Sequence, residues 1–223
     1  MKIRAVNLTR VFHIGLSRIA AVNDVNLEVN EEKFIAVIGP SGSGKSTLLN
    51  LLGLNDYPTS GKMLIDSKDT ALLSKKERRK IRLFRIGFVF QTFNLLSTLS
   101  ALENVELPMS LAGKPLEDQR EKAVKLLENV GLAHRLDHRP KELSVGEMQR
   151  VAIARSLINN PELIIADEPT GELDSKRANE IVDLLFDLKK RHKTTIIVAT
   201  HDQEIVEPAD EIYKIMDGKL SHR

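Results

Sequence analysis

The chain has 223 residues and a net charge of only +2, with 33 Lys and Arg against 31 Asp and Glu. This length suits one domain, or one domain with a small subdomain, and the balanced charge argues against a polycationic nucleic-acid binder. The chain contains no cysteine, which excludes a disulfide scaffold, a cysteine nucleophile and a thiolate metal site.

The sequence shows no segment that would enter a membrane. Residues 1–12 contain no apolar stretch typical of a signal peptide, and no apolar run approaches the roughly 20 residues that span a bilayer. We therefore expect any work at a membrane to require a separate membrane partner. An aromatic content of 4% without tryptophan also disfavours an aromatic platform for nucleic acid.

The first third of the chain is dominated by predicted strands. Residues 1–12 and 20–29 alternate loosely between apolar and polar, and residues 33–38 form a compact apolar run that ends at Gly39. Because glycine-rich sequence and an apolar helix over 45–54 follow, this run is interpreted as a buried strand that leads into a helix. Further strands are predicted at 61–66 and 86–90.

The middle of the chain, from about 92 to 160, is mostly helical in pattern. Residues 118–130 carry apolar side chains at helical spacing, and Gly131 follows as a C-terminal cap. Ser144 precedes a second predicted helix at 145–158 as its N-cap.

The last third returns to alternating strands and helices. A short apolar strand at 163–166 ends at Asp167, an amphipathic helix covers 175–190, and a strand at 195–199 is followed closely by His201. A terminal hairpin is predicted from 212 to 220. Such alternation implies an α/β fold with a parallel sheet under helical cover.

Residues 39–47, GPSGSGKST, carry the sharpest local signal. They match the phosphate-loop pattern G-x-x-x-x-G-K-[ST], with a strand before and a helix after. Glycines let backbone N–H groups point at phosphate oxygens, and the helix N-terminus adds partial positive charge. Lys45 would reach the β- and γ-phosphates, and the Ser46 hydroxyl would bind Mg²⁺. The predicted nucleotide-contacting residues of the loop are Gly39, Ser41, Gly42, Ser43, Gly44, Lys45, Ser46 and Thr47.

Two carboxylates follow the buried strand at 163–166. Asp167 suits the acidic strand end that holds Mg²⁺ beside a phosphate loop. Glu168 could orient and deprotonate an attacking water, which favours hydrolysis over transfer to another acceptor. By itself the phosphate loop leaves a kinase, a GTPase, a transporter motor and a DNA-repair ATPase open.

Several further features occur in an order that resembles the ATP-binding cassette (ABC) ATPases. They are the phosphate loop, Gln91 after a strand, the helical insert, LSVGE at 143–147, Asp167 with Glu168, the run from Glu172 to Asp174, and His201 after the next strand. The resemblance covers residues 1 to about 220. It implies an α/β fold whose mixed sheet has parallel strands and an antiparallel N-terminal part. It also implies a single domain, in which a helical subdomain at about 92–160 is inserted into a catalytic core formed by 1–91 and 161–223.

The resemblance also implies roles for single residues. Gln91 would contact Mg²⁺ and the attacking water and link them to a transmembrane partner, and His201 would hydrogen-bond near the γ-phosphate. Phe12 would stack on adenine, although a packed residue at a strand end is the alternative. Asp174 is predicted to be a further nucleotide-binding residue.

The signature segment departs from the family pattern LSGGQ, because this chain has LSVGE. Ser144 and Gly146 are retained, and in the family they meet the γ-phosphate held by a second subunit. Val145 adds bulk and Glu147 adds negative charge near the phosphates. We expect these two residues to tune nucleotide-driven dimerisation rather than abolish it.

The function that the resemblance implies is an ATP-binding and ATP-hydrolysing subunit that powers a membrane ABC transporter. Its substrate would be ATP with Mg²⁺. Its partners would be a second copy of itself in a head-to-tail dimer and an integral-membrane permease, with no nucleic acid, and it would lie in the cytoplasm against the inner face of the membrane.

Residues 86–108 most closely resemble the lipoprotein-releasing, macrolide-exporter and cell-division group. The alternative is an ABC-type ATPase that regulates a membrane partner without transport, whereas a chromosome or repair ATPase would need a long heptad insert that is absent.

Two further segments each have both a structural and a functional interpretation. Residues 75–85 are strongly basic, which favours a solvated helix face but also suits an anionic membrane surface. An apolar cluster of Phe93, Leu95, Leu96 and Leu99 could be subdomain core or a groove for a short permease helix.

Overall fold

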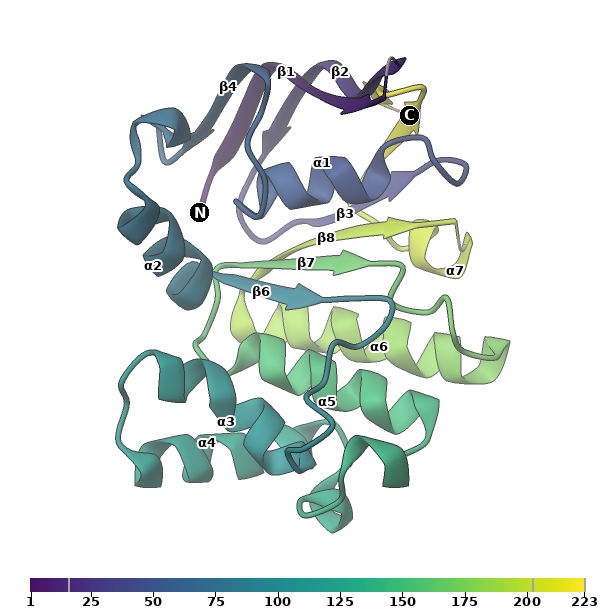
Figure 1. Ribbon diagram of the computed structural model, residues 1–223. Helices are drawn as coiled ribbons and strands as arrows, with labels where there is room; N and C mark the ends of the chain where they lie inside the picture. Colours follow the sequence, from purple (N-terminus) through teal and green to yellow (C-terminus); the bar gives the residue numbers. More distant parts are fainter. Residues whose placement is uncertain (16, 202, 223) are drawn as a thin grey trace.

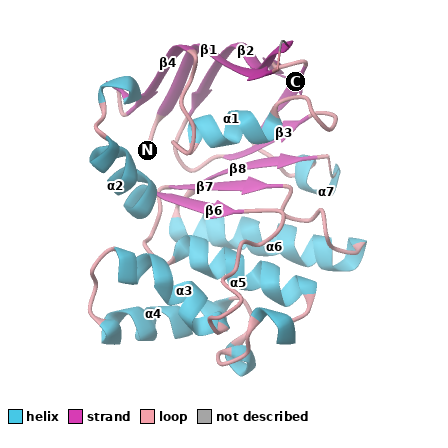
Figure 2. Cartoon of the chain, viewed as in Figure 1, coloured by secondary structure: helices cyan, strands magenta, loops and turns pink. Residues whose placement is uncertain are grey.

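The structure is a computed structural model that describes residues 1–15, 17–201 and 203–222, apart from the side chains at 14, 203 and 204. It contains two sheets with helix α1 between them and further helices below (Figures 1 and 2). The helices are α1 Lys45–Leu52, α2 Lys75–Arg85, α3 Ala101–Leu111, α4 Leu116–Asn129, α5 Val145–Leu157, α6 Ser175–His192 and α7 Gln203–Val206.

The smaller sheet is antiparallel and has four strands in the order β2-β1-β4-β5. It confirms the antiparallel N-terminal part that the resemblance implies. The strands are β1 Ile3–Ile14, β2 Ser17–Val29, β4 Ser60–Ile65 and β5 Lys68–Asp69.

The larger sheet has six strands in the order β10-β9-β3-β8-β7-β6, and five of them run parallel. Only β10 pairs antiparallel, in the hairpin with β9. The strands are β3 Phe34–Ile38, β6 Ile86–Val89, β7 Leu163–Asp167, β8 Thr195–Thr200, β9 Glu211–Met216 and β10 Lys219–His222.

The central strands bury both faces, as expected for a parallel sheet covered on each side. Ile164 and Ile196 point into a core shared with α3 to α6. Ile165 and Ile197 point into a second core formed with α1 and the antiparallel sheet. This period of two explains why β7 and β8 are apolar at every position of their centres.

The helical middle forms as predicted, with a few differences. Gly131 follows α4 with φ +79°, a conformation that suits glycine at a helix end, and Ser144 is the N-cap of α5. The sequence pattern does not specify α3, which contains Pro108, or the short elements β5 and α7. Among the described residues, short 3₁₀ turns lie at Thr70–Leu72, Ala133–Arg135 and Pro140–Glu142.

An ion-pair cluster joins the end of α2 to the start of β7. Arg85 Nε donates to Glu162 Oε1 at 2.5 Å, and Arg85 Nη2 donates to Asp66 Oδ2 at 2.6 Å. The hydrogen bond from Arg85 lowers the pKa of Glu162 to about 2, from an ordinary value of 4.5.

This shift predicts acid sensitivity. Because the native pKa of Glu162 lies below the unfolded value, the pair stabilises the fold fully above about pH 4.5 and the gain is lost as the pH falls toward 2. The free energy of unfolding of the wild type should therefore fall more steeply in this window than that of Glu162→Gln, measured by denaturant titration. Glu128→Gln, at an exposed carboxylate of α4, is the control that should keep the wild-type slope. Equal slopes for all three proteins would contradict the assignment.

Candidate nucleotide site

The carboxyl ends of the parallel strands meet at one edge of the larger sheet and form a cleft of about 570 Å³. The phosphate loop follows β3, Gln91 follows β6, Glu168 follows β7 and His201 follows β8, so chain topology alone brings them together. The cleft is lined by Ala21, Gly39, Pro40, Ser41, Gly42, Gly44, Lys45, Ser46, Thr47, Gln91, Glu168, Gly171 and His201.

The glycines of the loop are required by close approach and by backbone conformation. A Cβ on Gly44, where φ is +108°, would lie 2.0 Å from the carbonyl oxygen of Ala21. A Cβ on Gly39 would lie 2.3 Å from the carbonyl oxygen of Ile215. Larger residues would therefore push the loop away from β2 and β9, which fix it in place.

The Lys45 ammonium is held inside this loop. Its Nζ donates to the carbonyl oxygens of Gly39 at 2.7 Å and Pro40 at 3.2 Å, and lies 3.3 Å from Glu168 Oε1. The residue is only 7% exposed. A positive charge is therefore positioned at the cradle with little freedom to move.

Glu168 joins two other groups of the cleft. Its Oε2 lies 2.8 Å from His201 Nδ1, while its Oε1 faces Lys45. Its backbone has φ +46°, a left-handed conformation that non-glycine residues rarely adopt. The Glu168 N–H donates to the Ala199 carbonyl oxygen at 2.9 Å, which holds this strained turn against β8.

Asp167 has the features of a ligand for a hard cation. Its Oδ1 is buried and has no hydrogen-bond partner within the described structure. Burial raises the pKa of Asp167, and the Ser46 hydroxyl, by hydrogen bonding to the carboxylate, opposes that rise. An unpartnered buried carboxylate oxygen beside a hydroxyl is the donor set that Mg²⁺ prefers, so the residues present fit a magnesium ion.

Gln91 extends into the same cleft. Its Nε2 donates to Glu172 Oε1 at 3.1 Å, which connects the end of β6 to the loop after β7.

The remaining predicted residues lie outside this cleft. Ser144 and Gly146 line a separate cavity of about 170 Å³ at the start of α5. Asp174 is the N-cap of α6 and accepts from the Arg177 N–H at 3.0 Å. Phe12 lies on β1, and Ser43 is buried with a hydroxyl that has no partner in the described structure.

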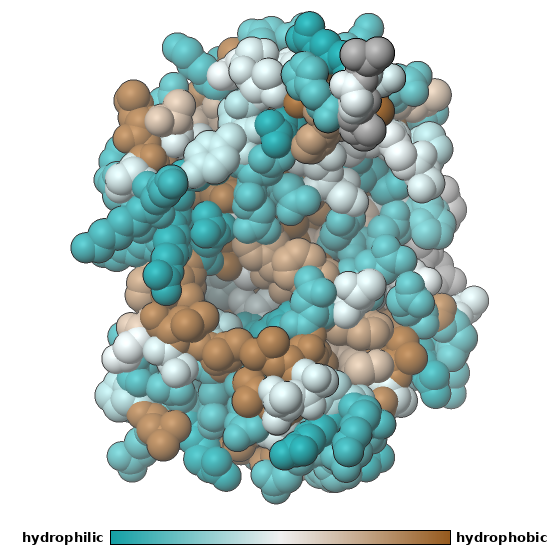
Figure 3. Space-filling model, viewed as in Figure 1, coloured by the Kyte–Doolittle hydropathy of each residue, from teal (hydrophilic) through white to brown (hydrophobic). Residues whose placement is uncertain are grey.

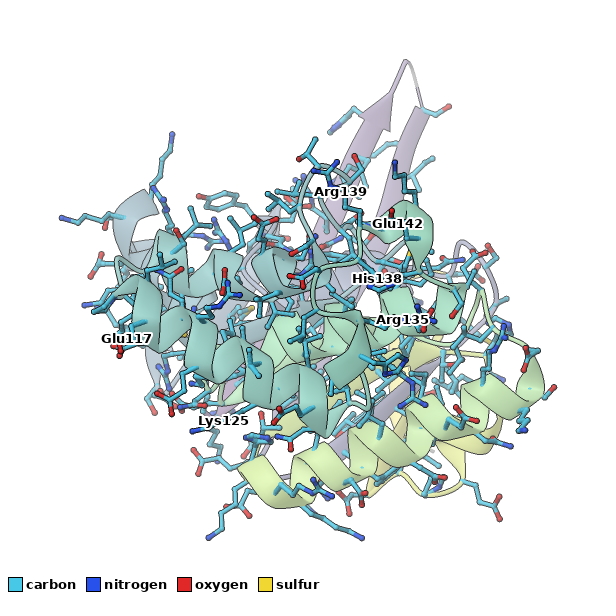
Figure 4. All side chains as sticks on the ribbon, turned by 90° about the horizontal axis from the view of Figure 1, so that it is seen from below. Glu117, Lys125, Arg135, His138, Arg139 and Glu142 are labelled. Atoms are coloured by element: carbon cyan, nitrogen blue, oxygen red, sulfur yellow. The ribbon has the colours of Figure 1, made fainter. Side chains whose placement is uncertain are left out.

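Glu147 does not extend freely from the signature helix. Its Oε2 accepts from the Ser144 N–H at 2.8 Å, and Ser144 Oγ accepts from the Glu147 N–H at 3.3 Å, which is a capping box. Its Oε1 accepts from Arg135 Nε at 2.9 Å. The hydrogen bond from the Ser144 backbone is the main cause that lowers the pKa of Glu147. Figure 4 shows Arg135 and His138 close together on the segment that precedes α5.

Sequence reasoning missed three kinds of residue here. Pro40 and Gly171 line the cleft, and Ala21 reaches it from a strand far away in the sequence. Arg135 compensates the charge of Glu147 from twelve residues upstream. Only Pro40 lay inside a recognised motif.

Comparisons with known proteins point to one family. The ABC transporter family matches residues 22–171. An uncharacterized ABC transporter ATP-binding protein of Thermotoga maritima is 47% identical over 96% of this chain and 92% of its own length. The lipoprotein-releasing system ATP-binding protein LolD of Legionella pneumophila is 45% identical over 97% of this chain and 95% of its own length. The macrolide export protein MacB of Chlorobaculum tepidum is 48% identical over 97% of this chain but only 33% of its own length.

Solved structures support the same conclusion. The dimeric ATP-binding cassette MJ0796, in a post-hydrolysis state bound to ADP and Pi, has a TM-score of 0.92 and 42% identity and covers 99% of this chain and 97% of its own. The chain therefore belongs to the ABC transporter family of ATP-binding proteins. It is an ATP-hydrolysing subunit that serves as the motor of a membrane transporter, of the group that includes LolD and MacB. Among the described residues, no helix is both long and apolar enough to cross a bilayer.

Proposed function

We propose that ATP binds with its phosphates in the loop at 39–47 and that Glu168 activates the water that attacks the γ-phosphate. The observation that supports this most is the convergence of Lys45, Glu168 and His201 on one cradle. Without nucleotide, Lys45 neutralises Glu168. Phosphate oxygens that draw the ammonium away would leave Glu168 free to accept a proton, with His201 near the transferred group.

Asp167, Ser46 and Gln91 are the residues that would hold Mg²⁺. The buried, unpartnered oxygen of Asp167 supports this assignment. When bound, the ion would neutralise charge on the β- and γ-phosphates. Gln91, with its Nε2 tied to Glu172, would present its amide oxygen toward the cleft.

We propose further that hydrolysis requires two copies of the chain. Ser144 and Gly146 lie in a cavity separate from the phosphate loop of the same chain, so another copy would bring its own phosphate loop to them. The start of α5 offers backbone N–H groups and a positive helix end to that phosphate. Asp174, at the start of α6 beside Arg177 of that cavity, would lie at the same contact.

The membrane partner would dock on an apolar groove, defined by Arg82, Leu83, Phe88, Phe90 and Leu111. Two cavities of about 270 and 240 Å³ share these residues, and Figure 3 shows a hollow with hydrophobic borders on the face that carries β6. The groove differs from the expected cluster at 93–99, of which Leu95 packs against the core and Leu96 is 47% exposed. The groove would lie between the catalytic core, 1–91 and 161–223, and the helical subdomain at about 92–160. In this arrangement the chain lies on the cytoplasmic face of the membrane.

If the permease binds in this groove, a substitution inside the groove should abolish permease binding and one outside it should not. Leu111, 57% exposed in the groove, should be needed for binding to a permease, whereas Leu116, 71% exposed on α4 outside it, should not. Tagged chains carrying Leu111→Glu or Leu116→Glu would be purified from native membranes and their partners identified by mass spectrometry. We expect one integral-membrane protein with the wild type and Leu116→Glu, and its loss with Leu111→Glu. Equal recovery with both variants would contradict the groove.

The second candidate, a regulator that signals to a membrane partner without transport, uses the same site and the same dimer. Both outputs need the groove and the two-site dimer, and the transporter proteins LolD and MacB among the relatives favour transport. Reconstitution of the purified complex in vesicles separates them: ATP-dependent movement or release of a substrate supports transport, and ATP turnover without it supports signalling.

A further inference from the structure

Arg10 lies against the ring of Phe12. Its guanidinium carbon is 4.5 Å from the ring centroid, within the range of a cation–π contact. Arg10 Nε also donates to Asp56 Oδ2 at 2.8 Å, and both of these side chains are 25% exposed. Arg10 is therefore held from two sides, by its own strand β1 and by the loop between α1 and β4.

Asp56 is itself a fixed anchor. Its Oδ1 accepts from the Tyr57 N–H at 2.7 Å, and its carbonyl oxygen accepts from Arg78 Nη2 at 2.8 Å. Arg78 is 2% exposed and lies 3.9 Å from the centroid of the Tyr57 ring. Arg78 of α2 holds the loop that carries Asp56. The Asp56 side chain is therefore already fixed in position, and its pairing with Arg10 costs little further conformational entropy.

Phe12 lies close to the nucleotide cleft through strand pairing. It pairs with Ile19 on β2, and the same strand carries Ala21, which lines the cleft and contacts Gly44. One face of the Phe12 ring is covered by Arg10. A flat base that stacks on this ring must therefore use the opposite face.

We propose that Arg10 is a positioning residue for the nucleobase: anchored by Asp56, it fixes the Phe12 ring and leaves one face for stacking. This inference rests on the proposed function, ATP binding, and on the stacking of adenine on Phe12 that the family resemblance implies. Fixing the ring before binding lowers the entropy lost when the base stacks. A cation on one face of the ring also orients it electrostatically. Arg10 acts on the base alone and has no part in holding the phosphates.

The test compares a ligand that has a base with one that lacks it. Affinities for ATP and for inorganic tripolyphosphate, each with Mg²⁺, are measured by calorimetry for the wild type and Arg10→Met. We expect ATP to bind about two- to tenfold more weakly to Arg10→Met, with tripolyphosphate unchanged. Asp56→Asn, which loosens the anchor but keeps Arg10, should show a smaller loss for ATP only. Arg4→Met, at an exposed arginine of the same strand, is the matched control and should leave both affinities unchanged.

A double-mutant cycle with Phe12→Ala completes the test. If Arg10 acts through the ring, Arg10→Met should weaken ATP no further once Phe12 is alanine. Equal losses for ATP and tripolyphosphate, unchanged ATP affinity, or tighter ATP binding by Arg10→Met would each overturn the inference. Phe12→Ala with wild-type ATP affinity would do the same. A wild type that bound neither ligand would instead overturn the proposed function itself, so the two failures are distinct.

Discussion

Replacing Glu168 with Gln is expected to lower ATP turnover by about 10² to 10⁴-fold, the usual contribution of a general base. The amide keeps the size of the side chain and can still hydrogen-bond to Lys45 or His201, but it cannot accept a proton from water. Binding of ATP should persist because the phosphate loop is unchanged. Turnover would be followed as phosphate release, and ATP affinity by calorimetry.

Asp187→Asn is the control for that experiment, since Asp187 is 61% exposed on α6. It removes one carboxylate with the same change of charge and should keep wild-type turnover. We also expect ATP to hold Glu168→Gln dimers together longer than wild-type dimers, because the nucleotide that joins them is not consumed. Wild-type turnover in Glu168→Gln would show that another group is the base.

Replacing Lys45 with Met should cost both binding and turnover. The ammonium donates to two loop carbonyl groups and is 7% exposed, so methionine would leave both carbonyl oxygens without this donor and remove the positive charge from the cradle. Hydrogen bonds to charged groups contribute about 1.5–3 kcal/mol, which corresponds to a loss of ATP affinity of about 10- to 100-fold. Calorimetry with ATP measures this loss directly.

A thermal unfolding curve separates that effect from misfolding. Lys45→Met leaves Glu168 with His201 as its remaining partner, so some change in stability is expected. Lys33→Met is the matched control, because Lys33 precedes the opposite end of β3 and is 41% exposed. It should bind ATP as the wild type does. A folded Lys45→Met protein with wild-type affinity would contradict the assigned role of Lys45.

The fold was largely readable from the sequence because most of its signals are local. The apolar runs of β3, β7 and β8 and the amphipathic pattern of α6 each contain enough residues to predict their type. The two-residue strand β5 and the four-residue helix α7 are too short to show any periodicity. Pro108 obscured α3, although the Ser100 and Glu103 capping box marks its start.

The location of the cleft residues could be predicted for a topological reason. Gln91, Glu168 and His201 each follow a parallel strand, and such strand ends meet at one edge of the sheet. The left-handed conformation of Glu168 and its contact with Lys45 have no local sequence signal. They arise from packing between strands that are far apart in the chain.

The surface features were harder to predict, since they depend on pairs of elements. The apolar groove is lined by Phe88 and Phe90 from one part of the chain and by Leu111 from another. The pattern of a single helix or strand therefore cannot reveal it. The partner of Arg10 is 46 residues away. For Glu147, sequence reasoning expected a negative charge near phosphate, but it gave no sign that the carboxylate accepts hydrogen bonds from the Ser144 N–H and from Arg135.

The most direct test of the two-copy site uses the absence of cysteine from the chain. Ser41→Cys and Val145→Cys would be made separately in the Glu168→Gln background, mixed, and oxidised with and without ATP. We predict a disulfide-linked dimer only in the mixture and only with ATP, because the phosphate loop of one copy then faces the signature helix of the other. No link in the mixture under conditions where ATP is bound, or an equal yield without ATP, would contradict the account.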